Sequence, residues 1–166
     1  MDFTMVSDIS PLSALTGLQH LWLSGTKKVT DISPLSVLTG LQQLKMSCMS
    51  VADVGPLSAL TGLQQLCLMH TKKVSDISPL SSLTGLQHLR LMHTSVADVR
   101  PLSSLTGLQH LDLSGTKVTD VSPLSSLTGL QHLELSGTRV TDLGRRAMKK
   151  QMRELRWQGA IADEAR

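Results

Sequence analysis

Residues 105–127 read LTGLQHLDLSGTKVTDVSPLSSL, and this stretch recurs with small changes along the 166-residue chain. The string Leu-Thr-Gly-Leu-Gln starts six times, at spacings of 23, 22, 23, 22 and 22 residues. Its first residues are Leu15, Leu38, Leu60, Leu83, Leu105 and Leu127. Self-similarity at a fixed period of this length indicates a solenoid, in which each unit packs against its neighbours.

Within one unit, apolar and polar residues alternate over 108–114, which predicts a short half-buried strand. Val118 and Val121 then return to the core. Asp120 precedes Ser122 and Pro123, so its carboxylate can accept hydrogen bonds from the free amides of a short turn or 3-10 segment. Each unit offers about seven aliphatic side chains, and burying each one contributes roughly 1.5–3 kcal/mol. The same capping role is expected for one aspartate in every unit: Asp8, Asp31, Asp53, Asp76, Asp98, Asp120 and Asp142.

The pattern LxxLxLxxTxVxDVSPLSxL resembles the leucine-rich-repeat family, in particular the 22-residue class of bacterial internalins and of a type-1 protein phosphatase regulatory subunit. The resemblance implies a curved α/β solenoid with a parallel β-sheet on its concave side and short turns or 3-10 segments on its convex side. Where the family usually has asparagine after the strand, Met49 stands in the second unit, and we expect an interruption of the hydrogen bonds there. The other units have threonine: Thr26, Thr71, Thr94, Thr116 and Thr138.

The chain is expected to form one domain with unequal ends. Residues 1–14 match the second half of a unit and predict a partial first repeat, from a longer array or as a frayed coil; residues 15–143 are the regular repeats. Residues 144–159 combine a helix-forming stretch with a weak copy of the strand frame. They predict a degenerate seventh capping coil with a helix on its outer side and Trp157 as its closing residue. Residues 160–166 are expected to fray.

The basic charge is concentrated in this C-terminal region, because residues 144–166 contain seven basic and three acidic side chains. Arg145, Lys149 and Arg153 share one stripe of the expected helix, which we interpret as a solvated outer face. Met148 and Met152 lie on another stripe and would face the core. A nucleic-acid or anionic-surface binder acting through this basic cap is one alternative function.

Composition limits the protein class further. The chain has two cysteines, Cys48 and Cys67, at different phases of adjacent units, which disfavours a disulfide. No apolar run is long enough to span a bilayer, and no secretory signal is visible in the first residues. We therefore expect a protein of the cytoplasm. An exported internalin-like adhesin fragment is a second alternative, which would require an export signal.

Catalysis is disfavoured by strand geometry. His110, Asp112 and Ser114 lie at alternate positions of one strand, about 6.6 Å apart, beyond the reach that a catalytic triad requires. His88, His110 and His132 should stack in a line, which aims a third ligand poorly at a tetrahedral ion. We expect no enzyme activity, metal or other cofactor. Stacked imidazoles should also resist simultaneous protonation, which lowers their pKa values.

The residues between the core leucines do not pack in the hydrophobic core, so they can vary without loss of the fold, and their variation can encode binding specificity. We predict a protein partner of unknown identity on the concave face, and a monomer or an edge-paired oligomer. Trp22, Arg90 and Met92 are the expected anchors, and His70 and His93 belong to the same variable surface. The predicted binding residues are Trp22, Lys45, Cys67, Met69, His88, Arg90, Met92, His110, Asp112, His132 and Glu134.

Overall fold

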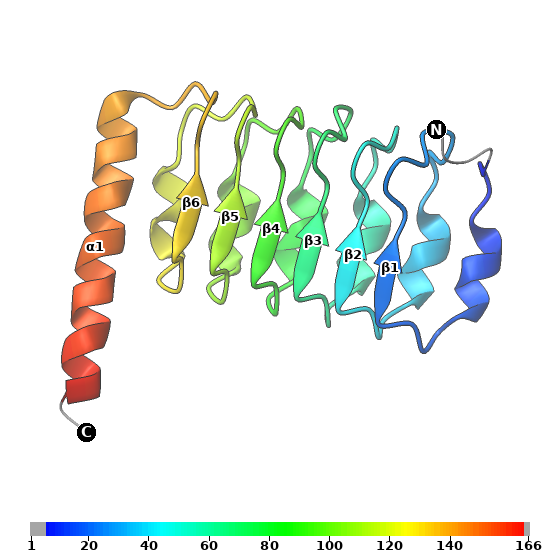
Figure 1. Ribbon diagram of the computed structural model, residues 1–166, viewed down its shortest axis with the longest axis horizontal. Helices are drawn as coiled ribbons and strands as arrows, with labels where there is room; N and C mark the ends of the chain where they lie inside the picture. Colours follow the sequence, from blue (N-terminus) through cyan, green and yellow to red (C-terminus); the bar gives the residue numbers. More distant parts are fainter. Residues whose placement is uncertain (1–5, 165–166) are drawn as a thin grey trace.

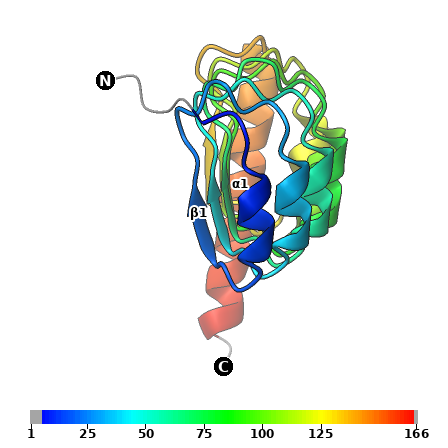
Figure 2. The same cartoon turned by 90° about the vertical axis from the view of Figure 1, so that its right-hand side faces the viewer.

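The repeated sequence folds into a single stack of coils. The computed structural model describes residues 6–164 and the side chains of residues 6–154. Each of the six coils has one strand on one side of the core and one 3-10 helix on the other, as Figure 2 shows end-on. The strands are β1 (His20–Trp22), β2 (Gln43–Lys45), β3 (Gln65–Cys67), β4 (His88–Arg90), β5 (His110–Asp112) and β6 (His132–Glu134). The 3-10 helices are η1 (Ser10–Ala14), η2 (Ser33–Val37), η3 (Gly55–Ala59), η4 (Ser78–Ser82), η5 (Arg100–Ser104) and η6 (Ser122–Ser126).

The six strands form one parallel sheet in the order of the chain, β1 to β6 (Figure 1). Register is fixed at each step, so that Leu89 of β4 pairs with Leu111 of β5. The backbone of each strand lies close only to neighbouring strands, and that of each 3-10 helix only to neighbouring 3-10 helices and, at the end of the stack, to the C-terminal helix. This architecture confirms the predicted solenoid with a parallel concave sheet and 3-10 segments behind it.

The core lies between the sheet and the 3-10 helices. In the fourth coil, Leu89, Leu91 and Val96 have no exposed surface. Among the described residues, no coil packs on the outer side of the first one, and Leu15 is 50% exposed, whereas its counterpart Leu38 in the next coil is fully buried. Burial of the aliphatic row is thus a property of stacking and not of a single coil.

The aspartates cap the 3-10 helices, as the sequence predicts. Asp120 Oδ1 accepts a hydrogen bond of 2.8 Å from the Ser122 amide, and the aspartates of the five preceding coils accept equivalent bonds. Asp142 is the exception, and the prediction for it is wrong. Asp142 is the first residue of an α-helix, and the hydroxyl of Thr141 instead accepts a hydrogen bond of 3.2 Å from the Gly144 amide.

Coil length varies between 22 and 23 residues without disturbing the sheet. The longer coils have a second lysine between the threonine that follows the strand and the next core valine, as in Thr26-Lys27-Lys28-Val29. A tight turn absorbs it, because the Val29 amide donates to the Thr26 carbonyl at 3.1 Å. The following 3-10 helix and strand therefore keep their places in the stack.

A threonine follows five of the six strands, and its hydroxyl bonds the backbone; four of these threonines are buried and Thr138 is half-buried. Thr94 Oγ1, for example, donates to the Leu91 carbonyl of its own coil at 2.7 Å. Met49 offers no hydroxyl at this position, which the sequence predicts to interrupt the pattern. In the structure, the Thr71 hydroxyl of the next coil reaches back and donates to the Met46 carbonyl at 2.9 Å. The neighbouring coil thereby bridges the interruption.

The C-terminal region is one α-helix, α1 (Asp142–Glu164), which lies beside the last coil in Figure 1. The predicted strand of a seventh coil in residues 152–158 is wrong, and helix also continues through most of the tail that was expected to fray. Arg, Lys, Gln, Met and Leu all favour helix, and no proline or glycine interrupts residues 145–158. Met148 packs into the core at 6% exposure. Trp157, the expected closing residue, lies outside the described side chains.

Arg145 does not form part of a solvated stripe, contrary to the sequence-based interpretation. Its side chain is half-buried, and its guanidinium donates to the carbonyls of Leu135 at 2.9 Å, Val140 at 3.1 Å and Thr138 at 3.2 Å. Nη2 also donates to the Thr138 hydroxyl at 3.1 Å. Arg145 thus satisfies acceptors at the end of the last coil.

Candidate functional site

The concave face is the solvent-facing side of the sheet, and strand register arranges its side chains in rows. The central leucine of each strand points to the core, so the residues on either side of it point outward. One row contains the last residue of each strand, and each member pairs with the next: Trp22, Lys45, Cys67, Arg90, Asp112 and Glu134. The row expected from the repeat phase is therefore the row that the strand register forms.

The first end of this row is an exposed aromatic residue beside a cation. Trp22 is 67% exposed, and the Lys45 ammonium lies 4.7 Å from the centre of its ring. A cation over an indole face is attracted by the quadrupole of the ring. The pair therefore holds a large apolar surface in the open at the β1 end of the sheet.

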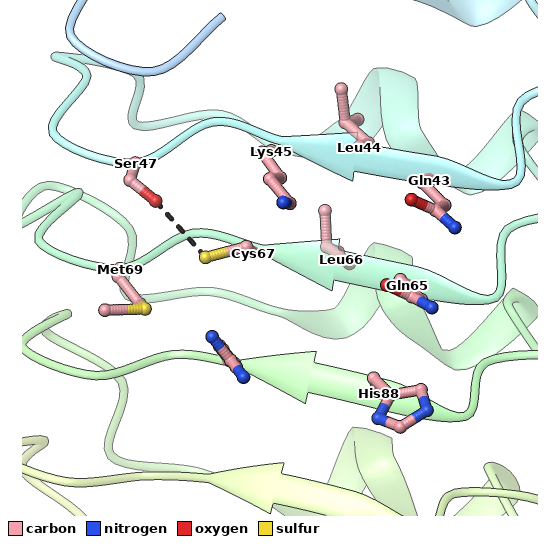
Figure 3. A pocket seen from close by; sticks show the side chains of 10 residues that line it. Gln43, Leu44, Lys45, Ser47, Gln65, Leu66, Cys67, Met69 and His88 are labelled. Carbon is pink, nitrogen blue, oxygen red and sulfur yellow. Dashed lines mark hydrogen bonds between the residues drawn. The ribbon is translucent and has the colours of Figure 1, made fainter. Parts of the chain in front are cut away.

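A depression of about 470 Å³ lies on β2, β3 and β4. Figure 3 shows Lys45, Cys67, Met69 and His88 around it, and Ser47 Oγ lies 3.2 Å from Cys67 Sγ. Both cysteines are free thiols. The depression combines a polarizable thioether with cationic and amide side chains, which suits an irregular protein surface better than a small rigid ligand.

Charge changes sign along the row. Lys45 and Arg90 lie on β2 and β4, whereas Asp112 and Glu134 lie on β5 and β6. Arg90 and Asp112 are register partners, yet no ion pair joins them in the part of the chain that the structure describes. A second depression of about 330 Å³ spans this junction, from β4 to β6. Both charges are therefore available to an incoming molecule.

The predicted histidine stack is present in the second depression. The ring centres of His88 and His110 are 4.4 Å apart, and those of His110 and His132 are 4.5 Å apart, with nearly parallel planes. Desolvation lowers the pKa of His110, and its two stacked neighbours and Arg90 lower it further by repulsion. This confirms the predicted direction for the central imidazole. Among the residues that the structure describes, no three His, Cys, Asp or Glu side chains are placed to hold a metal ion.

The remaining predicted residue, Met92, is half-buried two residues after the end of β4 and lines neither depression. Sequence reasoning missed a feature just beyond it. The residue three positions past the end of each strand has a left-handed backbone, and three of these residues are not glycine: Cys48 (φ 60°), His70 (φ 58°) and His93 (φ 56°). The other three are Gly25, Gly115 and Gly137. The sequence signal is that this one repeat position is glycine in three coils and a larger residue in the other three.

The fold recurs in known proteins. A family profile for Leucine Rich repeats (2 copies) matches residues 84–126 and 106–147. An internalin of Listeria monocytogenes, inlF, is similar over 82% of this chain and 40% of its own, with 40% identity and a TM-score of 0.80. Internalin C2 of the same organism is 34% identical over 82% of this chain and 60% of its own, with a TM-score of 0.77.

A leucine-rich-repeat protein of Leptospira interrogans is 22% identical over 85% of this chain and 37% of its own, with a TM-score of 0.78, and shares the fold. No curated protein sequence matches the chain significantly. The chain spans 40% to 60% of the length of the two internalins. No helix in the described part of the chain is both long and apolar enough to cross a bilayer. The repeat, the parallel register and these neighbours together identify the chain as a leucine-rich-repeat protein.

Proposed function

We propose that this chain is a non-catalytic interaction module that binds a protein partner on its concave face. The observation that carries the proposal is the exposed row from Trp22 to Glu134, whose members differ from coil to coil while the core leucines repeat. Tryptophan and arginine are the residue types that most often dominate binding energy at protein interfaces. Solenoid curvature also favours extended partners, because it presents many coils to one surface.

The order of charges supports a particular orientation of the partner. Lys45 and Arg90 favour an acidic segment, and Asp112 and Glu134 favour a basic one. β2 and β5 are three strand spacings apart, or about 14 Å. A partner segment with acidic and basic residues separated by this distance fits across the strands in one direction. The two free thiols suit a reducing compartment, and the proposal places the protein in the cytoplasm.

Affinity capture with two double variants tests the proposal. Trp22→Ala plus Arg90→Glu removes two exposed side chains of the row without touching the core. A hot-spot residue contributes 2 kcal/mol or more, so each change should weaken partner binding by about 30-fold. The matched control is Val37→Ala plus Arg146→Glu, which alters an exposed apolar and an exposed basic residue on η2 and α1.

Partners retained by the control and lost by the Trp22 and Arg90 variant support the proposal. Cross-links from those partners should map to β1–β6. If both variants retain the same partners, the concave face is not the binding surface. If only the control loses them, binding occurs through α1 and its basic residues instead.

A further inference from the structure

A second feature lies at the corner after β3 and β4, beside the concave rows. His70 and His93 occupy left-handed backbone positions in adjacent coils, where three other coils have glycine. Such a backbone is unfavourable for residues with a Cβ atom, so the two imidazoles are held there against a backbone preference. Their ring centres are 4.8 Å apart with planes tilted by 32°.

The two imidazoles line a shallow pocket of about 420 Å³ together with Lys72, Ser95 and Gly115. Gly115 makes room for the second ring, since a methyl group at this position would overlap the His93 imidazole. The backbone amides of His70 and His93 donate to the carbonyls of neighbouring coils at 2.8 Å. In these two residues, the imidazoles are therefore the groups left to donate a hydrogen bond to a ligand.

The chemistry of the lining favours an anion. It contains two imidazoles, one ammonium and one hydroxyl, and none of its five residues has a carboxylate. Lys72 forms no ion pair in the described part of the chain, so its charge is uncompensated. A metal ion would have two nitrogen ligands at most and would be repelled by the ammonium. An oxyanion could accept hydrogen bonds from all four polar side chains.

We propose that His70, Lys72, His93 and Ser95 form a binding site for a phosphate-class oxyanion, either free phosphate or a phosphomonoester. The site is separate from the concave row and does not depend on the function proposed above. His70 and His93 would clasp the anion from two adjacent coils, with the Lys72 ammonium neutralising its charge. Ser95 would donate its hydroxyl to one oxygen.

Titration of the protein with inorganic phosphate, followed by histidine Hε1 NMR resonances, tests the site. We expect saturable shifts of His70 and His93, with smaller shifts of His20 in the first strand. Lys72→Gln should raise the Kd at least tenfold. Lys27→Gln is the matched control, because Lys27 has the same place in the first coil but Gly25 stands where His70 does. This control should leave the Kd unchanged.

His93→Gly provides a variant whose folding is assured by glycine at the same position in other coils. It should raise the Kd at least tenfold while raising the melting temperature, because it removes the left-handed strain. A parallel titration with phenyl phosphate separates the two sources: tighter binding than phosphate indicates an esterified group, and equal binding indicates the free ion. Either result supports the oxyanion site.

Three outcomes would overturn the proposal. The first is a phosphate response that does not saturate. The second is an equal loss of affinity in the Lys27 and Lys72 variants, which would mean unspecific ion pairing. The third is binding of Zn²⁺ by His70 and His93, unaffected by Lys72→Gln, with no competition from phosphate.

Discussion

Replacing Gly25 by alanine should isolate the free-energy cost of a left-handed backbone at the corner that follows each strand. Gly25 has φ 84° at the turn after β1, and an added methyl group would have no atom within 4 Å. The substitution therefore creates no collision and removes no side-chain contact. What changes is the backbone preference of the residue in the folded and unfolded chains.

The magnitude follows from two opposing terms. A left-handed backbone costs an L-residue with a Cβ atom about 1–2 kcal/mol. Alanine also restricts the unfolded chain more than glycine, which offsets about 0.4–1 kcal/mol of that cost. We expect Gly25→Ala to lower the free energy of unfolding by about 1 kcal/mol. For a chain of this size, that change lowers the melting temperature by about 2–4 °C.

Urea and thermal unfolding followed by circular dichroism measure this change, with Gly17→Ala as the matched control. A methyl group on Gly17 would also have no atom within 4 Å, and φ there is not in the left-handed range. The control should therefore be neutral or slightly stabilising. The reverse change, Cys48→Gly, should stabilise the protein, because Cys48 is exposed and has φ 60°. Equal effects of Gly25→Ala and Gly17→Ala would refute the reasoning.

Two further predictions concern the caps. Hydrogen bonds from the Ser78 side chain and amide lower the pKa of Asp76, so its contribution to stability is present above about pH 4 and lost as the pH falls through the folded-state pKa. Asp76→Asn keeps an acceptor for Ser78 but does not titrate, and it should weaken the acid dependence of the melting temperature between pH 6 and 3. Arg145→Ala should destabilise the fold by about 2 kcal/mol in urea titrations, because backbone acceptors lose a charged donor. Arg146→Ala, at an exposed neighbour, should change stability by less than about 0.5 kcal/mol; an equal effect would contradict the capping role of Arg145.

The regular coils could be predicted from the sequence because their determinants are local. Strand, turn and cap each depend on residues within one unit, such as the alternation around Leu111 or the spacing between Asp120 and Ser122. Repetition then fixes the sheet, since only one parallel register keeps every leucine in the core. The rows of the concave face follow from that register without further information.

The C-terminal end could not be predicted in the same way. The apolar spacing in residues 152–158 fits a strand frame and also fits a helix, so the pattern alone does not separate them. The choice depends on helix propensity over the whole segment and on docking against η6, where Gln151 donates to the Ser125 carbonyl at 2.7 Å. The role of Arg145 is likewise tertiary, because its acceptors lie five to ten residues earlier in the chain.

The left-handed backbone at the corner after each strand could be predicted from the sequence only in part. Its glycines are visible in the sequence, but the conformation of Cys48, His70 and His93 follows only when the repeats are assumed to share one backbone. Side-chain placement there adds information that no spacing rule contains. The His93 ring lies over Gly115 of the next coil, and this contact creates the pocket that the two histidines share.

The two ends of the stack differ in how well their core leucines are covered, and this difference should set the order in which the coils unfold. At β1, Leu15 is half exposed and each lost coil uncovers another leucine layer, whereas α1 and Arg145 close the β6 side. Because coils contact only their neighbours, damage cannot be shared across the array. When these 166 residues are produced by themselves, heat or a pulling force should therefore unfold the coils one after another from β1, with the segment around β6 the last to unfold.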